Sequence, residues 1–128
     1  LNSILAQSDK KMAFMPYATA FLGFIIQYIK DINFKISLTA INITNKLLVL
    51  NMVAVNKYYK QMVTVLIEKL SDSKVIIRQA VLKCCGLLIK SYQPSMFGHQ
   101  AILYIQHTNW HVREGILHLV ANSLIVQS

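Results

Sequence analysis

The stretch DSKVIIRQAV, residues 72–81, recurs in altered form twice along the chain, as DINFKISLTA at 31–40 and as HTNWHVREGI at 107–116. The three copies come into register when one apolar position of each is aligned. These positions lie 41 and 35 residues apart, and they are Ile36, Ile77 and Val112. Periods of this length are typical of helical solenoids, in which each repeat buries its apolar face on its neighbours. The repetition therefore predicts an all-α solenoid.

The apolar residues that follow each aligned position have the i, i+4, i+7 spacing of an amphipathic helix. They are Ile36, Ala40, Ile43 and Leu47, then Ile77, Val81, Cys84 and Leu88, then Val112, Ile116 and Leu119. Another helical run precedes each aligned position, at 18–30, 58–70 and 100–106. We therefore expect about three helix pairs in the size range of HEAT repeats.

These runs divide the chain into three expected repeats, at about 17–50, 56–91 and 97–126, after an N-terminal helix or linker at 1–16. Longer joints should separate the repeats at 50–57 and at 91–98, where Pro94 and Gly98 break helices. The last helix is apolar to its end, which predicts that a further repeat follows it in the intact domain.

The loop inside each repeat is polar and offers residues that cap helix N-termini. The candidates are Asp31 or Asn33, Asp72 or Ser73, and Thr108 or Asn109. Phe34, Val75 and Trp110 follow these loops at equivalent positions. We expect Val75 and Trp110 to pack down at the start of their helices, whereas Phe34 can be either buried or exposed.

Composition narrows the function. Of the 128 residues, 55% are hydrophobic and 14% are charged, and four Gly and two Pro are too few for a β-sandwich. The net charge of +8 favours an acidic partner. Nucleic acid is an unlikely one, because the Lys residues are spread along the chain and form no dense stripe with interleaved aromatic residues.

The sequence gives little indication of enzymatic activity or of a metal, cofactor or small-molecule site. There are five Asp and Glu residues, and the four Gly form no phosphate-binding loop. Cys84 and Cys85 are expected to be small packing residues. His111, Glu114 and His118 follow i, i+3, i+7, but they do not form a His-Glu-x-x-His motif. We therefore expect no enzyme, no metal, no cofactor and no small-molecule substrate.

The uncharged stretch 12–29 raises the question of a membrane span. It contains Pro16, Tyr17, Thr19, Gln27 and Tyr28, whereas a span needs about 20 predominantly apolar residues. A buried amphipathic helix is the better interpretation, so no membrane is expected as a partner.

At its loops the sequence resembles the TOG domains of the CLASP and crescerin families, which are HEAT-repeat modules that bind tubulin. The resemblance rests on NFKI at 33–36, on LSDSK at 70–74 with Ile77 and Arg78, and on HTNWHVREG at 107–115. It covers about residues 17–126, in the order of the first three repeats of a longer domain. The resemblance therefore implies that residues 17–128 are the first half of a TOG-like domain.

In that family, the loops inside the repeats form one edge that contacts tubulin. Carried over by position, the tubulin-binding residues would be Asn33, Phe34, Lys35, Ser73, Lys74, Asn109, Trp110 and His111. The resemblance implies a non-enzymatic module that regulates microtubule dynamics in the cytoplasm and cytoskeleton, or in the cilium and axoneme. The alternative is a HEAT-repeat scaffold that does not bind tubulin, with its charge on a helical face instead of on the loops.

One position departs from the repeat pattern. Ser37 stands where the other two repeats have Arg78 and Arg113. We expect each of these arginines to pair with the Asp of its preceding loop and so to tie one repeat to the next.

Overall fold

The computed structural model describes residues 16–50, 54–92 and 94–127, and within these residues the chain is helical with no strand. The helices are α2 (Pro16–Ile29), α3 (Phe34–Val49), α4 (Ala54–Lys57), α5 (Tyr59–Lys69), α6 (Val75–Ser91), α7 (Pro94–Ala101), the 3-10 helix η1 (Ile102–Tyr104) and α8 (Trp110–Gln127). The predicted all-α fold is confirmed. The expected N-terminal helix or linker lies outside the described residues, except for Pro16.

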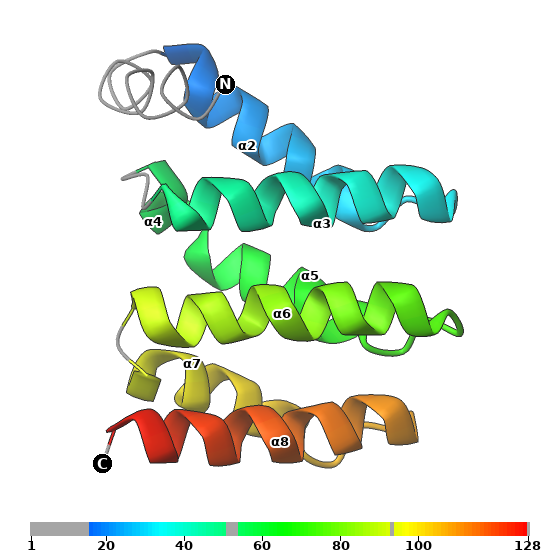
Figure 1. The fold of residues 1–128 in the computed structure, drawn as a ribbon, viewed down its shortest axis with the longest axis vertical. Helices are drawn as coiled ribbons and strands as arrows, with labels where there is room; N and C mark the ends of the chain where they lie inside the picture. The colour runs from blue at the N-terminus through cyan, green and yellow to red at the C-terminus, as the bar shows by residue number, and fades with distance from the viewer. Residues whose placement is uncertain (1–15, 51–53, 93, 128) are drawn as a thin grey trace.

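The helices form a two-layered solenoid of three antiparallel pairs, α2 with α3, α5 with α6, and α7 and η1 with α8 (Figure 1). One layer stacks α3, α6 and α8, and the other stacks α2, α5 and α7. The three short loops inside the pairs lie at the same edge of the molecule (Figure 1). The repetition in the sequence has therefore become a repetition in space.

The core lies between the two layers, and the middle pair supplies much of it. Ile77, Val81, Cys84 and Leu88, which share the predicted apolar face of α6, are all fully buried. Burying one large aliphatic side chain stabilises a fold by about 1.5–3 kcal/mol. This face packs against elements on both sides, because α6 contacts α3 and α8.

The equivalent face of α3 is only partly covered. Ala40 and Leu47 are buried, but Ile36 is exposed and Ile43 is half-buried. The two isoleucines border a depression between α2 and α3 that Tyr28 of α2 also lines. The equivalence of α3 and α6 in sequence therefore extends to their helical form but not to their burial.

Both expected joints contain helix, which corrects the sequence-based prediction. α7 begins at Pro94, because a proline in the first helical position lacks only an N–H that has no intrahelical partner. Gly98 continues α7, and a Cβ at this position would lie 3.2 Å from Ser123 Oγ of α8. In the first joint, a short helical turn, α4, follows residues 51–53.

The question of a membrane span is settled for the described residues. Within 16–50, 54–92 and 94–127, no helix is both long enough and apolar enough to cross a bilayer.

Candidate functional site

The candidate site is the edge formed by the three loops inside the helix pairs, residues 30–33, 70–74 and 105–109, which we call the edge loops. Each edge loop ends with the same turn, directly before the helix that follows it. The backbone N–H groups of Asn33, Lys74 and Asn109 donate to side-chain atoms two residues earlier. The acceptors are Asp31 Oδ1 at 2.8 Å, Asp72 Oδ1 at 2.8 Å and His107 Nδ1 at 3.0 Å.

Two of the predicted site residues cap helices. Asn33 Oδ1 accepts from the Lys35 N–H at 3.0 Å, and Asn109 Oδ1 accepts from the His111 N–H at 2.8 Å. The helix that begins at Val75 has no side-chain cap, because Lys74 precedes it. The two asparagines therefore shape the edge loops, and their side-chain oxygens are already engaged.

A second set of bonds fixes each edge loop to the first turn of the following helix. Arg78 Nη1 donates to the Asp72 carbonyl at 2.7 Å, and Arg113 Nη1 donates to the His107 and Thr108 carbonyls at 2.8 and 2.9 Å. The expected ion pairs with Asp are wrong, because the acceptors are backbone carbonyls of the same repeat. Each arginine thus holds its own loop instead of tying two repeats together.

Ser37, at the equivalent position of the first repeat, also donates a hydrogen bond to a backbone carbonyl, from a shorter side chain. Its Oγ donates to the Ile29 carbonyl at 2.6 Å, at the end of α2, and the residue is fully buried. The side chain at this position therefore differs from that of the other two repeats, but the hydrogen bond to a backbone carbonyl is kept.

The first residues of α3, α6 and α8 project from the edge. Phe34 is 37% exposed, Val75 55% and Trp110 57%. The expectation that Val75 and Trp110 pack down is wrong. A helical side chain leans toward the N-terminus of its helix, so at the first position it extends past the helix end, where it has no neighbouring turn to cover it.

One contact joins adjacent repeats at the edge, between Lys74, the last residue of the second edge loop, and Phe34, the first residue of α3. The Lys74 ammonium lies over the Phe34 ring, 4.6 Å from its centroid. Both residues are predicted site residues, and they belong to the second and the first repeat. Lys74 has no ion-pair partner in the described part of the chain, so the ring of Phe34 supports a cation that remains free to meet a partner.

The third edge loop is arranged differently. The Trp110 and His111 rings have centroids 3.8 Å apart. His107 Nε2 lies 3.4 Å from Glu68 Oε2, which connects this loop to α5 of the preceding repeat. Because His107 Nδ1 accepts from the Asn109 N–H, its other nitrogen can donate to the carboxylate. The third edge loop and the first residues of α8 therefore present aromatic surface and half-buried imidazoles instead of a lysine.

Two exposed residues of the edge were missed by the sequence reasoning. Ile32 is fully exposed at the tip of the first loop, and Val75 is exposed beside Lys74. An apolar residue within the polar stretch between Asp31 and Asn33 was the available signal for Ile32. For Val75 the signal was its alignment with Phe34 and Trp110.

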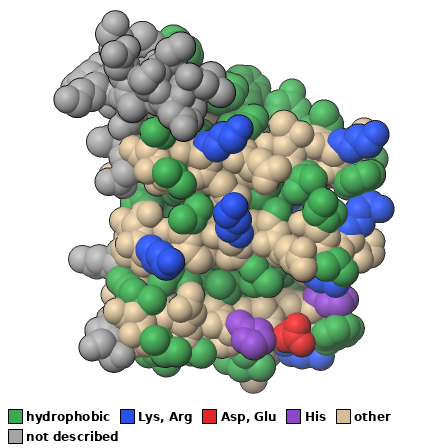
Figure 2. Space-filling model, in the orientation of Figure 1, with side chains coloured by type: hydrophobic (Ala, Val, Ile, Leu, Met, Phe, Trp, Pro, Cys, Tyr) green, Lys and Arg blue, Asp and Glu red, His purple; other side chains and the backbone are tan. Residues whose placement is uncertain are grey.

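Charge is unevenly distributed over the solenoid. α3 and α6 contain no Asp or Glu, and both carry exposed lysines on the face seen in Figure 2. Glu114 supplies acidic charge on α8, and Figure 2 shows one acidic patch in the lower part of the same view. Lys35 and Lys74 extend this positive character to the edge, where both are exposed.

The cysteines and the predicted metal-ligand pattern lie apart from the edge chemistry. Cys84 and Cys85 are free thiols in the core, and burial raises the pKa of the Cys84 thiol to about 12. Among the residues that the structure describes, no three His, Cys, Asp or Glu side chains are grouped as a metal site requires.

Comparison with known proteins adds one structural relative. No family model matches the sequence, and no curated protein sequence matches it. The fold is similar to a solved structure of crescerin, which is described as using a TOG domain array to regulate microtubules in the primary cilium. The TM-score is 0.69 at 17% identity, over 89% of this chain and 52% of that chain. The fold is therefore TOG-like, and the chain spans about half the length of that relative.

Proposed function

We propose that this TOG-like solenoid is a tubulin-binding module that regulates microtubule dynamics through its edge loops, without chemistry of its own. The proposal treats residues 17–128 as the first half of a TOG-like domain in the cytoplasmic or ciliary cytoskeleton. The microtubule role of crescerin and the resemblance of the loops support it. The fold is that of a scaffold, which favours recognition over catalysis.

The observation that carries the proposal is the contact between Phe34 and Lys74. An exposed aromatic ring with an ammonium 4.6 Å from its centroid presents apolar surface and positive charge at one point of a rigid edge. Aromatic residues dominate the binding energy of protein interfaces, and charges at the rim guide the approach of an acidic partner. Trp110 offers a second aromatic surface on the same edge.

The test is binding of Phe34→Ala and Lys74→Ala to free tubulin and to microtubules, measured in the intact domain. Phe34→Ala should weaken binding by about 2 kcal/mol, or about 30-fold, as truncating an interface anchor does. Lys74→Ala should cost less, and its effect should shrink at high salt because a rim charge is screened. Matched controls are Leu117→Ala and Lys83→Ala, which change an exposed leucine of α8 and an exposed lysine of α6 away from the loops.

Thermal unfolding of the same variants separates binding from folding. Phe34→Ala should retain most of its stability, because the ring is 37% exposed. A loss of about 3–5 kcal/mol in unfolding free energy, with normal tubulin binding by the folded fraction, would instead place Phe34 in the core. The tubulin proposal would then fail at its first loop.

A second candidate function is a scaffold that binds another acidic protein through a helical face. The exposed lysines of α3 and α6 favour it, namely Lys46, Lys83 and Lys90. Reversing these three charges to Glu should leave the dissociation rate from tubulin unchanged if the edge loops are the interface. Absence of tubulin binding by the unchanged intact domain would support the scaffold.

A further inference from the structure

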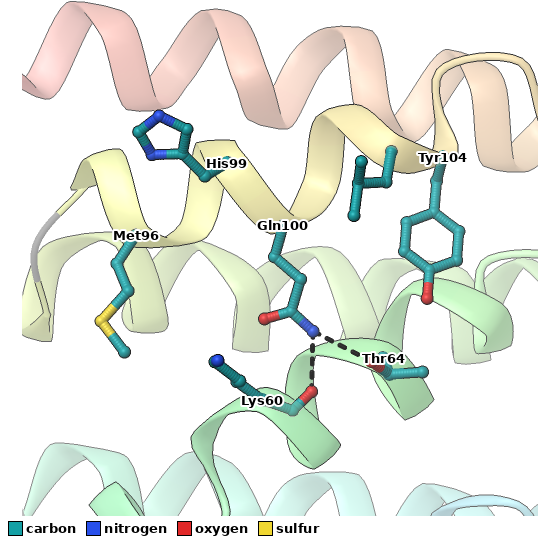
Figure 3. Close-up of a pocket in the computed structure, with 7 residues that line it drawn as sticks. Lys60, Thr64, Met96, His99, Gln100 and Tyr104 are labelled. Atoms are coloured by element: carbon teal, nitrogen blue, oxygen red, sulfur yellow. Dashed lines mark hydrogen bonds between the residues drawn. The ribbon is translucent and has the colours of Figure 1, made fainter.

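A groove between the second and third helix pairs is separate from the edge loops. It has a volume of about 560 Å³ and is lined by Lys60 and Thr64 of α5, Met96, His99 and Gln100 of α7, and Leu103 and Tyr104 of η1. The side chains of Met96, Gln100 and Tyr104 point toward α5 (Figure 3). We call this site the α5–α7 groove. Its volume lies in the range of about 300–1,000 Å³ typical of ligand sites.

Gln100 holds the wall of the groove in place and leaves one acceptor open. Its Nε2 donates to the Lys60 carbonyl at 2.7 Å and to Thr64 Oγ1 at 2.9 Å, which joins α7 to α5 (Figure 3). Both amide hydrogens are thereby used, and the amide oxygen has no hydrogen-bond partner within the described chain. That oxygen can accept from the backbone N–H of an extended peptide.

The groove also exposes large apolar side chains to the solvent. Leu103 is 79% exposed and Met96 40%, and both line the groove. A cluster of exposed apolar side chains beside convergent polar groups indicates a binding surface rather than scattered surface residues. Methionine is suited to such a surface because its flexible thioether adapts to different apolar partners.

The charged residues at the groove indicate that its partner is acidic. No carboxylate lines the groove, and Lys60 is exposed without an ion pair among the described residues. His99 lies at the boundary, points toward α8 (Figure 3), and its Nδ1 lies 2.8 Å from the Ser95 carbonyl. Glu68, which lies one turn after Thr64 on α5, is engaged with His107 at 3.4 Å. The groove therefore offers Lys60 as its free charge.

We propose that the α5–α7 groove binds a short acidic peptide segment in an extended conformation. An apolar side chain of the segment packs against Met96 and Leu103, and an adjacent carboxylate pairs with Lys60. The Gln100 amide oxygen accepts a backbone N–H of the segment between these two contacts. This site does not depend on the proposed tubulin contact, because none of its residues belongs to the edge loops.

The probe is a fluorescein-labelled pentapeptide with a central leucine flanked by glutamates, and binding is measured by fluorescence anisotropy. Lys60→Glu and Leu103→Asp should each weaken binding about tenfold or more. The matched controls are Lys83→Glu, which makes the same charge change on α6, and Leu117→Asp, which makes the same change on α8. Both controls should bind the peptide as the unchanged chain does.

Further arms distinguish the alternatives. A peptide with serine in place of the leucine should bind about tenfold more weakly, and Phe34→Ala should bind the original peptide normally. Equal binding by Lys60→Glu and the unchanged chain, with circular dichroism confirming the fold, would overturn the proposal. So would equal losses in Lys60→Glu and Lys83→Glu, which would indicate general charge attraction. Tighter binding of an oligothymidylate that depends on Lys60 would assign the groove to nucleic acid instead.

Discussion

At the scale of single residues, equivalent positions of the three repeats keep a bond and change the side chain that makes it. Ser37, Arg78 and Arg113 lie in the first turns of α3, α6 and α8, and each donates to a backbone carbonyl that precedes its helix. Asp31, Asp72 and His107 all accept from an N–H two residues ahead. Sequence identity between repeats is low at these positions because hydrogen-bonding capacity, and not residue type, is what the edge requires.

The core thiols give a pH prediction at this scale. Burial raises the pKa of Cys84 from 9.0 to about 12, and it also raises the pKa of Cys85. An acid whose pKa is higher in the folded state favours folding below its unfolded-state pKa. Its contribution is lost as the pH rises through the range between the two values. The free energy of unfolding should therefore fall between pH 9 and pH 12 by up to about 1.4 kcal/mol per pH unit through Cys84, and titration of Cys85 should act in the same direction.

The matched variant is Cys84→Ala, which removes one of the two titrating thiols. Urea unfolding at a series of pH values should show a shallower decline for this variant than for the unchanged chain. Parallel curves would show that Tyr59 causes the loss, since burial also raises the pKa of Tyr59 to about 12. The same burial predicts that neither thiol reacts with a maleimide at pH 7 unless the protein unfolds.

At the scale of helices, two glycines in the interiors of α6 and α8 have different roles. A Cβ on Gly115 of α8 would lie 2.9 Å from Leu70 Cδ1, whereas nothing lies within 4 Å of a Cβ on Gly86 of α6. Leu70 is buried at the end of α5, so its side chain has little room to move. Gly115 thus allows the third repeat to approach the second, and Gly86 serves no such contact.

Alanine substitution should therefore stabilise one helix and destabilise the other. Gly86→Ala should raise the free energy of unfolding by about 0.5–1 kcal/mol through helix propensity. Gly115→Ala should lower the free energy of unfolding by about 1–3 kcal/mol through overpacking, and the gain in helix propensity offsets part of this loss. Thermal denaturation of both variants checks this, and stabilisation by Gly115→Ala would show that Leu70 adapts at no cost.

At the scale of the whole molecule, charge governs encounter more than stability. The net charge is +8, and the described residues contain two ion pairs, Lys69 with Asp72 at 3.3 Å and His107 with Glu68 at 3.4 Å. Most lysines are thus left to the solvent or to an acidic partner. Such a field accelerates association with an oppositely charged protein.

The corresponding prediction concerns rates. Raising the ionic strength from about 0.1 M to about 1 M shortens the Debye length from about 10 Å to about 3 Å. The association rate with tubulin should fall strongly over this range, and the dissociation rate should change little. Phe34→Ala should show the reverse, a faster dissociation with nearly unchanged association. A salt effect confined to dissociation would contradict steering by the net charge.

The sequence by itself determined the helical solenoid, because apolar spacing within a helix and its repetition along the chain are both local patterns. It also located the edge loops, since cap residues and polar stretches mark helix ends. It could not determine the extent of α7, where Pro94 and Gly98 were interpreted as breakers. A proline is compatible with the first turn of a helix, and Gly98 faces a helix that is distant in sequence.

Only the tertiary structure decided how the candidate sites are built. The Lys74–Phe34 contact joins residues 40 positions apart, and the groove joins α5 to α7 through Gln100, so neither follows from spacing along the chain. Exposure likewise depended on packing, since Phe34, Val75 and Trp110 extend past helix ends where no neighbour covers them. Local periodicity fixes which face of a helix is apolar, whereas burial depends on what the rest of the chain places against that face.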